Sequence, residues 1–435
     1  MSVLKRPSRR TAIAALITGG LLAGALTVIA ASPYGDARPA AAAVQPQQDA
    51  TQQQDTIVAG EQLQLAETGA KTVAIKTAAA KAGTSQQVCA AADSRWVRVR
   101  FKELSLTGKD TVTVTGSAGG SYTLKATNWQ GKAFYTRAFQ GNCVTVKPSF
   151  SSAASSYRVD AYQAGIAATV IVAAAGDICG SACNQTRPLV ESMNPVAVIT
   201  AGDNAYESGT LSEYNNSYNP QWGVFKSKTY PSAGNHEYQT SGAKGYFDYF
   251  NGVGQNTGRA GERGKGYYSY DVGDWHFVAL NSNVAKTASS AQVQWLRADL
   301  AASTKPCTAA YWHHSRFAAG NYSDNTSVQP FFQALYDYKA DLVVSGHDHN
   351  YIRFAPSKPD GTKDAVNGVR QLLIGTGGRA LYGAGGTTKA TIEKKDYSTF
   401  GVGKLTLTAT GYTAAFVPVA GRTFTDSVQG TCHPK

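Results

Sequence analysis

Val170-Ile-Val-Ala-Ala-Ala-Gly-Asp177 and Val196-Ala-Val-Ile-Thr-Ala-Gly-Asp203 are two unbroken apolar runs, and each of them ends in Gly-Asp. Such runs are expected of strands that are buried on both faces of a sheet. Because ligands at the carboxyl ends of adjacent strands converge above the sheet, we expect Asp177 and Asp203 to face one crevice. A single Gly-Asp is usually only a turn, so a shared site is indicated only if further segments of this kind occur.

The sequence around these runs alternates between strands and helices. Helical patterns cover residues 291–301 and 328–339, and residues 341–345 form another buried strand. Residues 266–281 are predicted to form an antiparallel hairpin that turns at Gly273-Asp274, and residues 401–425 alternate as strands. Residues 165–435 are therefore predicted to form an α/β sandwich that contains a mixed sheet.

Residues 57–164 follow a different pattern. Short runs at 96–101, 111–115, 122–126 and 157–162 place apolar residues on one face, and Gly-rich turns separate them. No long helical period interrupts these runs, so we predict a smaller all-β sandwich. It is a candidate surface for contact with a cell surface or a polymer.

Residues 1–43 have the features of an export signal. A basic start is followed by an apolar stretch from about 11 to 31 and an Ala-rich, cleavage-like run at 40–43. Ser8-Arg9-Arg10 resembles the start of a twin-arginine signal, although the next three residues match it poorly. The alternative is a membrane anchor, but the small residues and the cleavage-like run favour removal. Residues 44–56 are Gln-rich and are predicted to be a flexible linker, so we expect a secreted or cell-surface protein without a stable membrane span.

Charge and cysteine content narrow the function further. The net charge of +12 could steer anionic substrates, but no Lys/Arg block indicates a nucleic-acid groove. Six cysteines in an exported chain suggest disulfides, for which fifteen pairings are open. Position along the chain favours the pairs Cys89–Cys143, Cys179–Cys183 and Cys307–Cys432.

Five segments place candidate metal ligands at or near strand ends. They are G-D-I-C with Asp177, G-D-N-A-Y with Asp203 and Tyr206, G-N-H-E with Asn235 and His236, W-H-H-S with His313 and His314, and G-H-D-H with His347 and His349. Five of the seven histidines lie in these segments, which indicates a shared site. Carboxylate, amide, imidazole and phenolate donors suit Fe, Mn and Zn, and they differ from a thiolate structural zinc site. The set predicts a metal-dependent hydrolase.

In this order the segments resemble the motifs of calcineurin-like metallophosphoesterases, and among these the purple acid phosphatase type, over residues 168–425. The resemblance implies a four-layer αββα sandwich of two sheets flanked by helices. It also implies two metal ions, Fe(III) with Zn, Mn or Fe(II). By the resemblance, one metal is held by Asp177, Tyr206, His349 and bridging Asp203, and the other by Asp203, Asn235, His313 and His347.

Two positions bear on the subtype. General calcineurin-like enzymes place a His two residues after the first Asp, where this chain has Cys179. The purple type instead has a Tyr three residues after the second Asp, and Tyr206 matches it. Cys179 is either a thiolate ligand or, with Cys183 nearby, half of a disulfide. Tyr206 is either a ligand or a packed tyrosine.

The remaining polar residues are candidates for other roles. His236 and His314 are candidate catalytic residues. His236 would stabilise the phosphoryl oxygens or protonate the leaving group. His314 would contact the phosphate, with a histidine that only supports a ligand or lies at the surface as the alternative. Arg316 is a candidate phosphate contact, with a solvated loop arginine as the alternative. Glu237 is predicted to orient ligands rather than to act as a base.

The expected activity is hydrolysis of small phosphate monoesters by a metal-bridging hydroxide, because no activated Ser or Cys motif is evident. A phosphodiesterase or nucleotide hydrolase on the same scaffold is one alternative. An exported binding protein with a vestigial site is the other, although the full ligand set argues against it.

Overall fold

The computed structural model describes residues 71–74, 85–127, 132–166, 169–385 and 388–435. The predicted export signal at 1–43 and linker at 44–56 lie outside the described residues. Within the described residues, no helix is long and apolar enough to cross a membrane. Residues Gln54–Lys435 form one compact unit, so the domain boundary expected between 164 and 165 stays a prediction.

The N-terminal region is rich in β-structure, as predicted. One antiparallel sheet consists of β1 (Lys71–Ala74), β9 (Ser156–Gly165), β3 (Trp96–Ser105) and β6 (Phe134–Tyr135), with β7 (Phe139–Gln140) also paired to β3. The other consists of β2 (Gln86–Cys89), β8 (Cys143–Ser149), β4 (Thr111–Gly116) and β5 (Ser121–Lys125). Alternate residues of β4 and β9 are buried, and together they enclose one apolar core. The period-two pattern therefore placed the buried face correctly.

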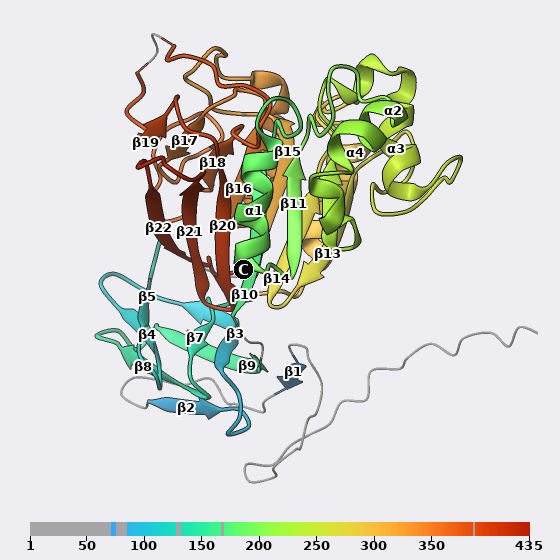
Figure 1. The fold of residues 1–435 in the computed structure, drawn as a ribbon. Coiled ribbons are helices and arrows are strands. Elements are labelled where there is room, and N and C mark those ends of the chain that lie inside the picture. The colour runs from blue at the N-terminus through green and yellow to red at the C-terminus, as the bar shows by residue number, and fades with distance from the viewer. Residues whose placement is uncertain (1–70, 75–84, 128–131, 167–168, 386–387) are drawn as a thin grey trace, which may run out of the picture. The chain divides into compact units, whose positions relative to one another are not determined.

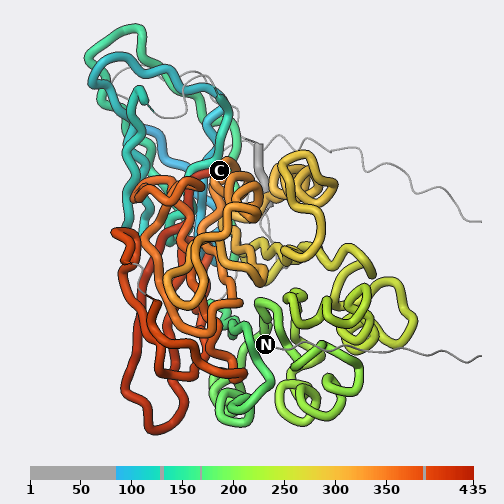
Figure 2. The backbone as a smooth tube through the Cα atoms, turned by 90° about the horizontal axis from the view of Figure 1, so that it is seen from above, coloured from blue at the N-terminus to red at the C-terminus, as the bar shows by residue number. Residues whose placement is uncertain are grey.

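Two larger mixed sheets follow. The six-stranded sheet has the order β12 (Thr229–Ser232), β11 (Ala197–Ala201), β10 (Val170–Ala175), β20 (Gly401–Thr408), β21 (Gly411–Pro418) and β22 (Asp426–Thr431). The seven-stranded sheet has the order β13 (Tyr268–Val272), β14 (Trp275–Ala279), β15 (Cys307–His314), β16 (Leu342–Gly346), β18 (Arg370–Ile374), β17 (Tyr351–Phe354) and β19 (Ile392–Asp396). Strands β10, β11 and β12 run parallel, and so do β14, β15, β16 and β18. Figures 1 and 2 show the red C-terminal strands beside the green segment that contains β10.

The two mixed sheets pack face to face, and helices cover their outer faces. Apolar side chains of both sheets, such as Ile199 and Val344, share one buried core. The outer face of the six-stranded sheet packs with α1 (Cys183–Met193) and α3 (Lys244–Asn251), and α1 crosses in front of it in Figure 1. The outer face of the seven-stranded sheet packs with α4 (Ala291–Ala302) and α5 (Gln329–Asp337). The four-layer αββα sandwich is thereby confirmed.

Short helical segments complete the connections. They are α2 (Leu211–Glu213), the π-helical turn η1 (Tyr214–Tyr218) and the 3₁₀ segments η2 (Trp222–Lys228), η3 (Glu237–Gln239), η4 (Ser241–Ala243) and η5 (Thr326–Val328). Thr210 and Glu213 form a capping box at the start of α2. In the sequence, the segments from α2 to η2 lie between β11 and β12, and η3 and η4 lie between β12 and α3.

The cysteines form two of the three expected bridges. Cys89–Cys143 joins directly opposed residues of β2 and β8, and Cys307–Cys432 joins the start of β15 to the residue after β22. The predicted Cys179–Cys183 bridge is wrong, because both residues are buried free thiols. Their side chains are hydrogen-bonded to each other instead.

His276 on β14 has a structural role. Its Nδ1 lies 2.9 Å from Asp271 Oδ1 and its Nε2 lies 2.8 Å from Asp299 Oδ2. Burial alone would lower the pKa of His276, but the hydrogen bonds to Asp271 and Asp299 outweigh it and raise that pKa. Protonated His276 can donate to both carboxylates at once.

We expect His276→Gln to destabilise the protein more at about pH 5.5 than at about pH 8.5. The native pKa is raised, so the stabilisation is complete below the unfolded-state pKa and is lost as the pH rises through the native pKa. Urea unfolding of both proteins at the two pH values measures the difference. An equal loss at both values would contradict the assignment.

Candidate metal centre

The candidate ligands lie where parallel strands of both mixed sheets end. Asp177 follows β10 and Asp203 follows β11, whereas His347 follows β16 of the other sheet. The His347 backbone N–H donates to Asp177 Oδ2 at 2.8 Å and so joins the two sheets at this edge. The carboxyl ends of the strands therefore meet in a single crevice, as the two apolar runs predicted.

Three of the candidate ligands have left-handed backbone conformations. The φ angles are 58° at Asp177, 50° at Asp203 and 74° at His347. These angles are unfavourable for residues with a Cβ, and such strain concentrates at functional sites. Gly202 has φ of 79°, and a Cβ there would lie 2.6 Å from the His313 ring. The Gly-Asp turn thus lets the histidine approach the chain closely.

The first group of donors gathers around Asp177. Its Oδ1 lies 3.2 Å from His349 Nε2 and 3.3 Å from the Tyr206 hydroxyl. The same hydroxyl lies 3.4 Å from Asp203 Oδ2. All four side chains are buried. They are the four residues that the family resemblance implied for one metal.

The second group shares Asp203 with the first. His313 Nε2 lies 3.1 Å from Asp203 Oδ2, 3.0 Å from Asn235 Oδ1 and 3.2 Å from His347 Nδ1. One ring nitrogen carries at most one proton and cannot donate to three neighbours. The four donor atoms therefore converge as metal ligands do, and they are the set implied for the second metal.

The chemistry of the donors fits a cation. His313 Nδ1 lies 2.9 Å from the Ala201 carbonyl oxygen and donates to it, so the neutral ring would leave the Nε2 lone pair aimed at the Asp203 and Asn235 oxygens. Burial lowers the pKa of His313, but Asp203 outweighs this effect and raises that pKa to about 9. Burial, followed by Asp203 and Asp177, raises the pKa of the Tyr206 hydroxyl. The carboxylates therefore favour positive charge in the cluster, and metal ions would supply this charge.

Glu237 supports the loop that carries Asp203, in agreement with its predicted role. Its buried carboxylate accepts hydrogen bonds from the backbone N–H groups of Asp203 at 2.9 Å, Asn204 at 2.8 Å and Gly234 at 2.7 Å. The Tyr214 hydroxyl donates to it at 2.9 Å. One side chain therefore holds two of the ligand-bearing loops in register.

His236 and His314 lie beside the cluster on different sides. The His236 ring packs on Tyr206, with ring centroids 4.5 Å apart, and its Nδ1 contacts the Glu207 carbonyl, so Nε2 is left to face the crevice. The Ser282 hydroxyl accepts from the His314 N–H at 3.2 Å and lies 2.8 Å from His314 Nδ1. The Ser282 hydroxyl can donate to Nδ1 or accept from it, so either neutral tautomer of His314 fits this contact.

Burial, followed by the neighbouring His313 and His347, lowers the pKa of His314 to about 2. This imidazole therefore favours its neutral form, in which one of the two ring nitrogens carries the proton. A neutral N–H group can donate a hydrogen bond to a phosphoryl oxygen without transferring its proton.

Arg316 is buried and hydrogen-bonded to later parts of the chain, and its predicted phosphate contact stays a prediction. The buried guanidinium donates to the Pro359 carbonyl at 2.9 Å and to Gln329 Oε1 at 3.3 Å. Arg316 is close to His313 in sequence, but it follows the end of β15, and its guanidinium contacts the later residues Gln329 and Pro359.

Several residues near the ligands were missed by the sequence analysis. Arg379 lies over the Tyr206 ring at 4.7 Å and pairs with Glu207. Tyr322 and Tyr382 stack on two of the histidines. The G-T-G-G-R run after β18 was the available signal for Arg379, because it repeats the Gly-rich ending of the ligand-bearing strands.

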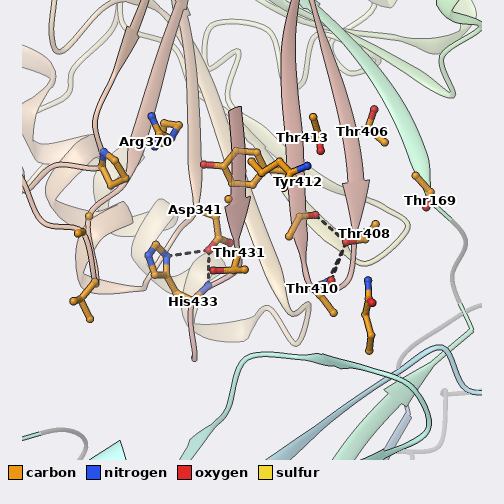
Figure 3. Close-up of a pocket in the computed structure, with 18 of the residues that line it drawn as sticks. Thr169, Asp341, Arg370, Thr406, Thr408, Thr410, Tyr412, Thr413, Thr431 and His433 are labelled. Atoms are coloured by element: carbon orange, nitrogen blue, oxygen red, sulfur yellow. Dashed lines mark hydrogen bonds and ion pairs between the residues drawn. The ribbon is translucent and has the colours of Figure 1, made fainter. Parts of the chain in front are cut away.

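A cavity of about 750 Å³ lies away from the cluster of candidate ligands. Figure 3 shows Asp341, Tyr412, Thr431 and His433 in its wall, and the Asp341 carboxylate accepts from the His433 N–H at 2.7 Å. Asp341 precedes β16, whereas His347 follows it, so the cavity is at the opposite end of that strand. Size alone would have pointed to the wrong end of the sheet.

Comparison with known proteins defines the class of this domain. Residues 171–351 match the family model described as calcineurin-like phosphoesterase. The region that holds the cluster thus matches the calcineurin-like phosphoesterase model, and the resemblance to the purple acid phosphatase type is confirmed.

Particular relatives make the resemblance more specific. Purple acid phosphatase 15 of Arabidopsis thaliana is 32% identical over 127 residues, which are 28% of this chain and 24% of that protein. Purple acid phosphatase 23 of the same plant is 29% identical over 155 residues, or 31% of this chain and 33% of that protein. The chain thus spans about a quarter to a third of these curated relatives. A purple acid phosphatase from yellow lupin seeds shares the fold, with a TM-score of 0.54 and 15% identity over 79% of this chain and 74% of that one.

Proposed function

We propose that this chain hydrolyses phosphate monoesters with two metal ions held by seven side chains. One ion would be held by Asp177, Tyr206, His349 and Asp203, and the other by Asp203, Asn235, His313 and His347. The observation that carries the proposal is the convergence of these donors, at 3.0–3.4 Å from one another, into two groups that share Asp203. The similarity to purple acid phosphatases supports the same conclusion.

The protein contributes binding and orientation around the metals. When bound, a metal pair supplies Lewis acidity, an activated water and neutralisation of phosphoryl charge. Glu237 and Ala201 fix the positions of Asp203 and His313 before substrate arrives. In the neutral tautomer with the proton on Nε2, His314 would donate to a phosphoryl oxygen, and His236 is placed to donate from Nε2 on the other side.

The metal pair that we propose is Fe(III) with Zn, Mn or Fe(II). A Tyr206 phenolate on Fe(III) would give a visible charge-transfer band, because phenolate is a good ligand for a hard cation. We expect Tyr206→Phe to lose this band while the variant keeps the ring packing against His236. Visible spectra and metal analysis of both proteins test this, and an unchanged band in the variant would exclude Tyr206 as the ligand.

Metal analysis, combined with rates on two esters, tests the phosphodiesterase alternative and the non-catalytic alternative. Rates on para-nitrophenyl phosphate against its bis-ester separate a monoesterase from a phosphodiesterase. We expect the monoester to be hydrolysed faster. If the protein purified without chelator held no metal and hydrolysed neither ester, the exported binding protein would be the better hypothesis.

The setting of the activity is also a proposal. Residues 1–43 would export the chain to the outside or the surface of the cell, where small phosphorylated compounds are the substrates. The two disulfides are consistent with an oxidising compartment. The N-terminal β-region would contact a polymer or the cell surface.

A further inference from the structure

Two tyrosines cover two of the candidate ligand histidines. The Tyr322 ring stacks on His347, with ring centroids 4.1 Å apart and an angle of 24° between the planes. The Tyr382 ring stacks on His349 at 3.9 Å and 6°. The two tyrosines meet edge to face, with centroids 6.2 Å apart. They form a continuous aromatic wall on one side of the ligand cluster.

The loop that carries Tyr322 is held in place by hydrogen bonds. The Asp348 carboxylate, which lies between the two histidines in sequence, accepts from the Gly320 N–H at 2.9 Å and the Asn321 N–H at 3.0 Å. On the other side of Tyr322, Asp324 accepts from the Ala318 N–H at 3.0 Å. The loop is therefore closed on itself, and the ring is positioned before any ligand binds.

A cavity opens beside this wall. It has a volume of about 250 Å³ and is lined by His347, Asp348, Tyr322 and the polar run 323–327. Tyr322 is 39% exposed, which leaves part of the ring free for a ligand. Tyr382 is half-buried. For comparison, a cavity of about 150 Å³ is sufficient to hold benzene. The cavity can therefore hold one ring next to a ligand histidine.

We propose that Tyr322 is a specificity-determining residue that stacks on a planar ring in the ester group of the substrate. The inference rests on the proposed function, and it narrows the substrate class to phosphate monoesters with an aromatic ring one or two bonds from the ester oxygen. A phosphoryl group at the cluster would place such a ring in the cavity that His347 and Tyr322 share. Stacked rings attract each other beyond the effect of buried area, so a saturated ring of similar size should bind less well.

The test uses two non-hydrolysable phosphonates that differ only in the ring. Benzylphosphonate is planar at the ring and cyclohexylmethylphosphonate is not. Calorimetric titration of the metal-loaded protein should show that the benzyl compound binds roughly three- to tenfold tighter. Tyr322→Phe should keep this ratio, because the ring is retained, and Tyr322→Ala should bring it close to one.

Controls separate specificity from a structural role. Tyr267→Ala removes another tyrosine in an aromatic pair, which packs tilted on Trp295 with ring centroids 5.0 Å apart, and it should leave the ratio unchanged. Metal content is measured for every variant, because Tyr322 also supports His347. A merely structural role would weaken both phosphonates equally and leave the ratio as it is in the wild type.

The outcomes distinguish this inference from the proposed function. If the wild type hydrolyses monoesters but binds both phosphonates equally, or if Tyr322→Ala keeps the preference, only the role of Tyr322 is overturned. If the wild type binds neither phosphonate and hydrolyses no ester, the proposed function falls and the inference falls with it.

Discussion

Asp203→Asn is expected to lose both bound metal and turnover. The Asp203 carboxylate lies 3.4 Å from the Tyr206 hydroxyl and 3.1 Å from His313 Nε2, so it contacts both proposed ligand groups and is the proposed bridge. A neutral amide cannot balance two cations in a buried site. Because the Lewis-acid stabilisation is worth several kcal/mol, we expect activity to fall at least about a thousandfold. Elemental analysis and rates on para-nitrophenyl phosphate measure the two losses.

Asp337→Asn is the matched control for this experiment. Asp337 ends α5, is partly exposed and pairs with Arg297 at 2.7 Å. The same chemical change there should leave metal content and turnover as they are in the wild type. If Asp203→Asn also kept full metal and full activity, the bridging assignment would be wrong.

Glu237→Ala is expected to have the largest effect on stability. The substitution removes the acceptor for the N–H groups of Asp203, Asn204 and Gly234 and for the Tyr214 hydroxyl, all inside the protein. Buried donors without acceptors each cost about 1–3 kcal/mol, so the free energy of unfolding should fall by at least about 3 kcal/mol. Urea unfolding at neutral pH measures the loss.

Two further variants make the result specific. Glu191→Ala removes an exposed carboxylate that pairs with Arg187 on α1, and it should change stability by no more than about 0.5 kcal/mol. Glu237→Gln keeps the volume but turns an NH₂ group toward the same donors. It should lower metal affinity by roughly 10- to 100-fold even if it folds. Similar unfolding free energies for Glu237→Ala and Glu191→Ala would contradict the role of Glu237.

Hairpins and helices were predictable from the sequence where turn residues and apolar periodicity determine them. The hairpin at Gly273-Asp274 corresponds to β13 and β14, and the helical periods at 291–301 and 328–339 correspond to α4 and α5. The insertion of β20 beside β10 was not predictable, because residues more than 200 positions apart pair there and no local signal encodes this contact. The division into two sheets was implied by the family resemblance and not by the pattern.

The candidate site divides in a similar way. The residues brought together, Asp177, Asp203 and His313 among them, follow or end strands, and a strand end fixes the position of a side chain closely. Arg316 lies only three residues beyond His313, but a loop separates it from the strand, and its direction depends on contacts with Gln329 and Pro359. Tyr322 and Tyr382 also lie in loops without periodicity. The stacking of Tyr322 depends on loop closure by Asp348, which sequence spacing alone does not reveal.

The left-handed conformations at Asp177, Asp203 and His347 set stability against function. Each costs roughly 1 kcal/mol or more relative to glycine, which adopts this conformation freely. Glycine at any of the three positions would relax the backbone and delete a proposed ligand in one step. Directed evolution of this protein for heat resistance, if carried out without metal, should therefore favour inactive variants at these three codons. Selection in the presence of metal should retain Asp177, Asp203 and His347.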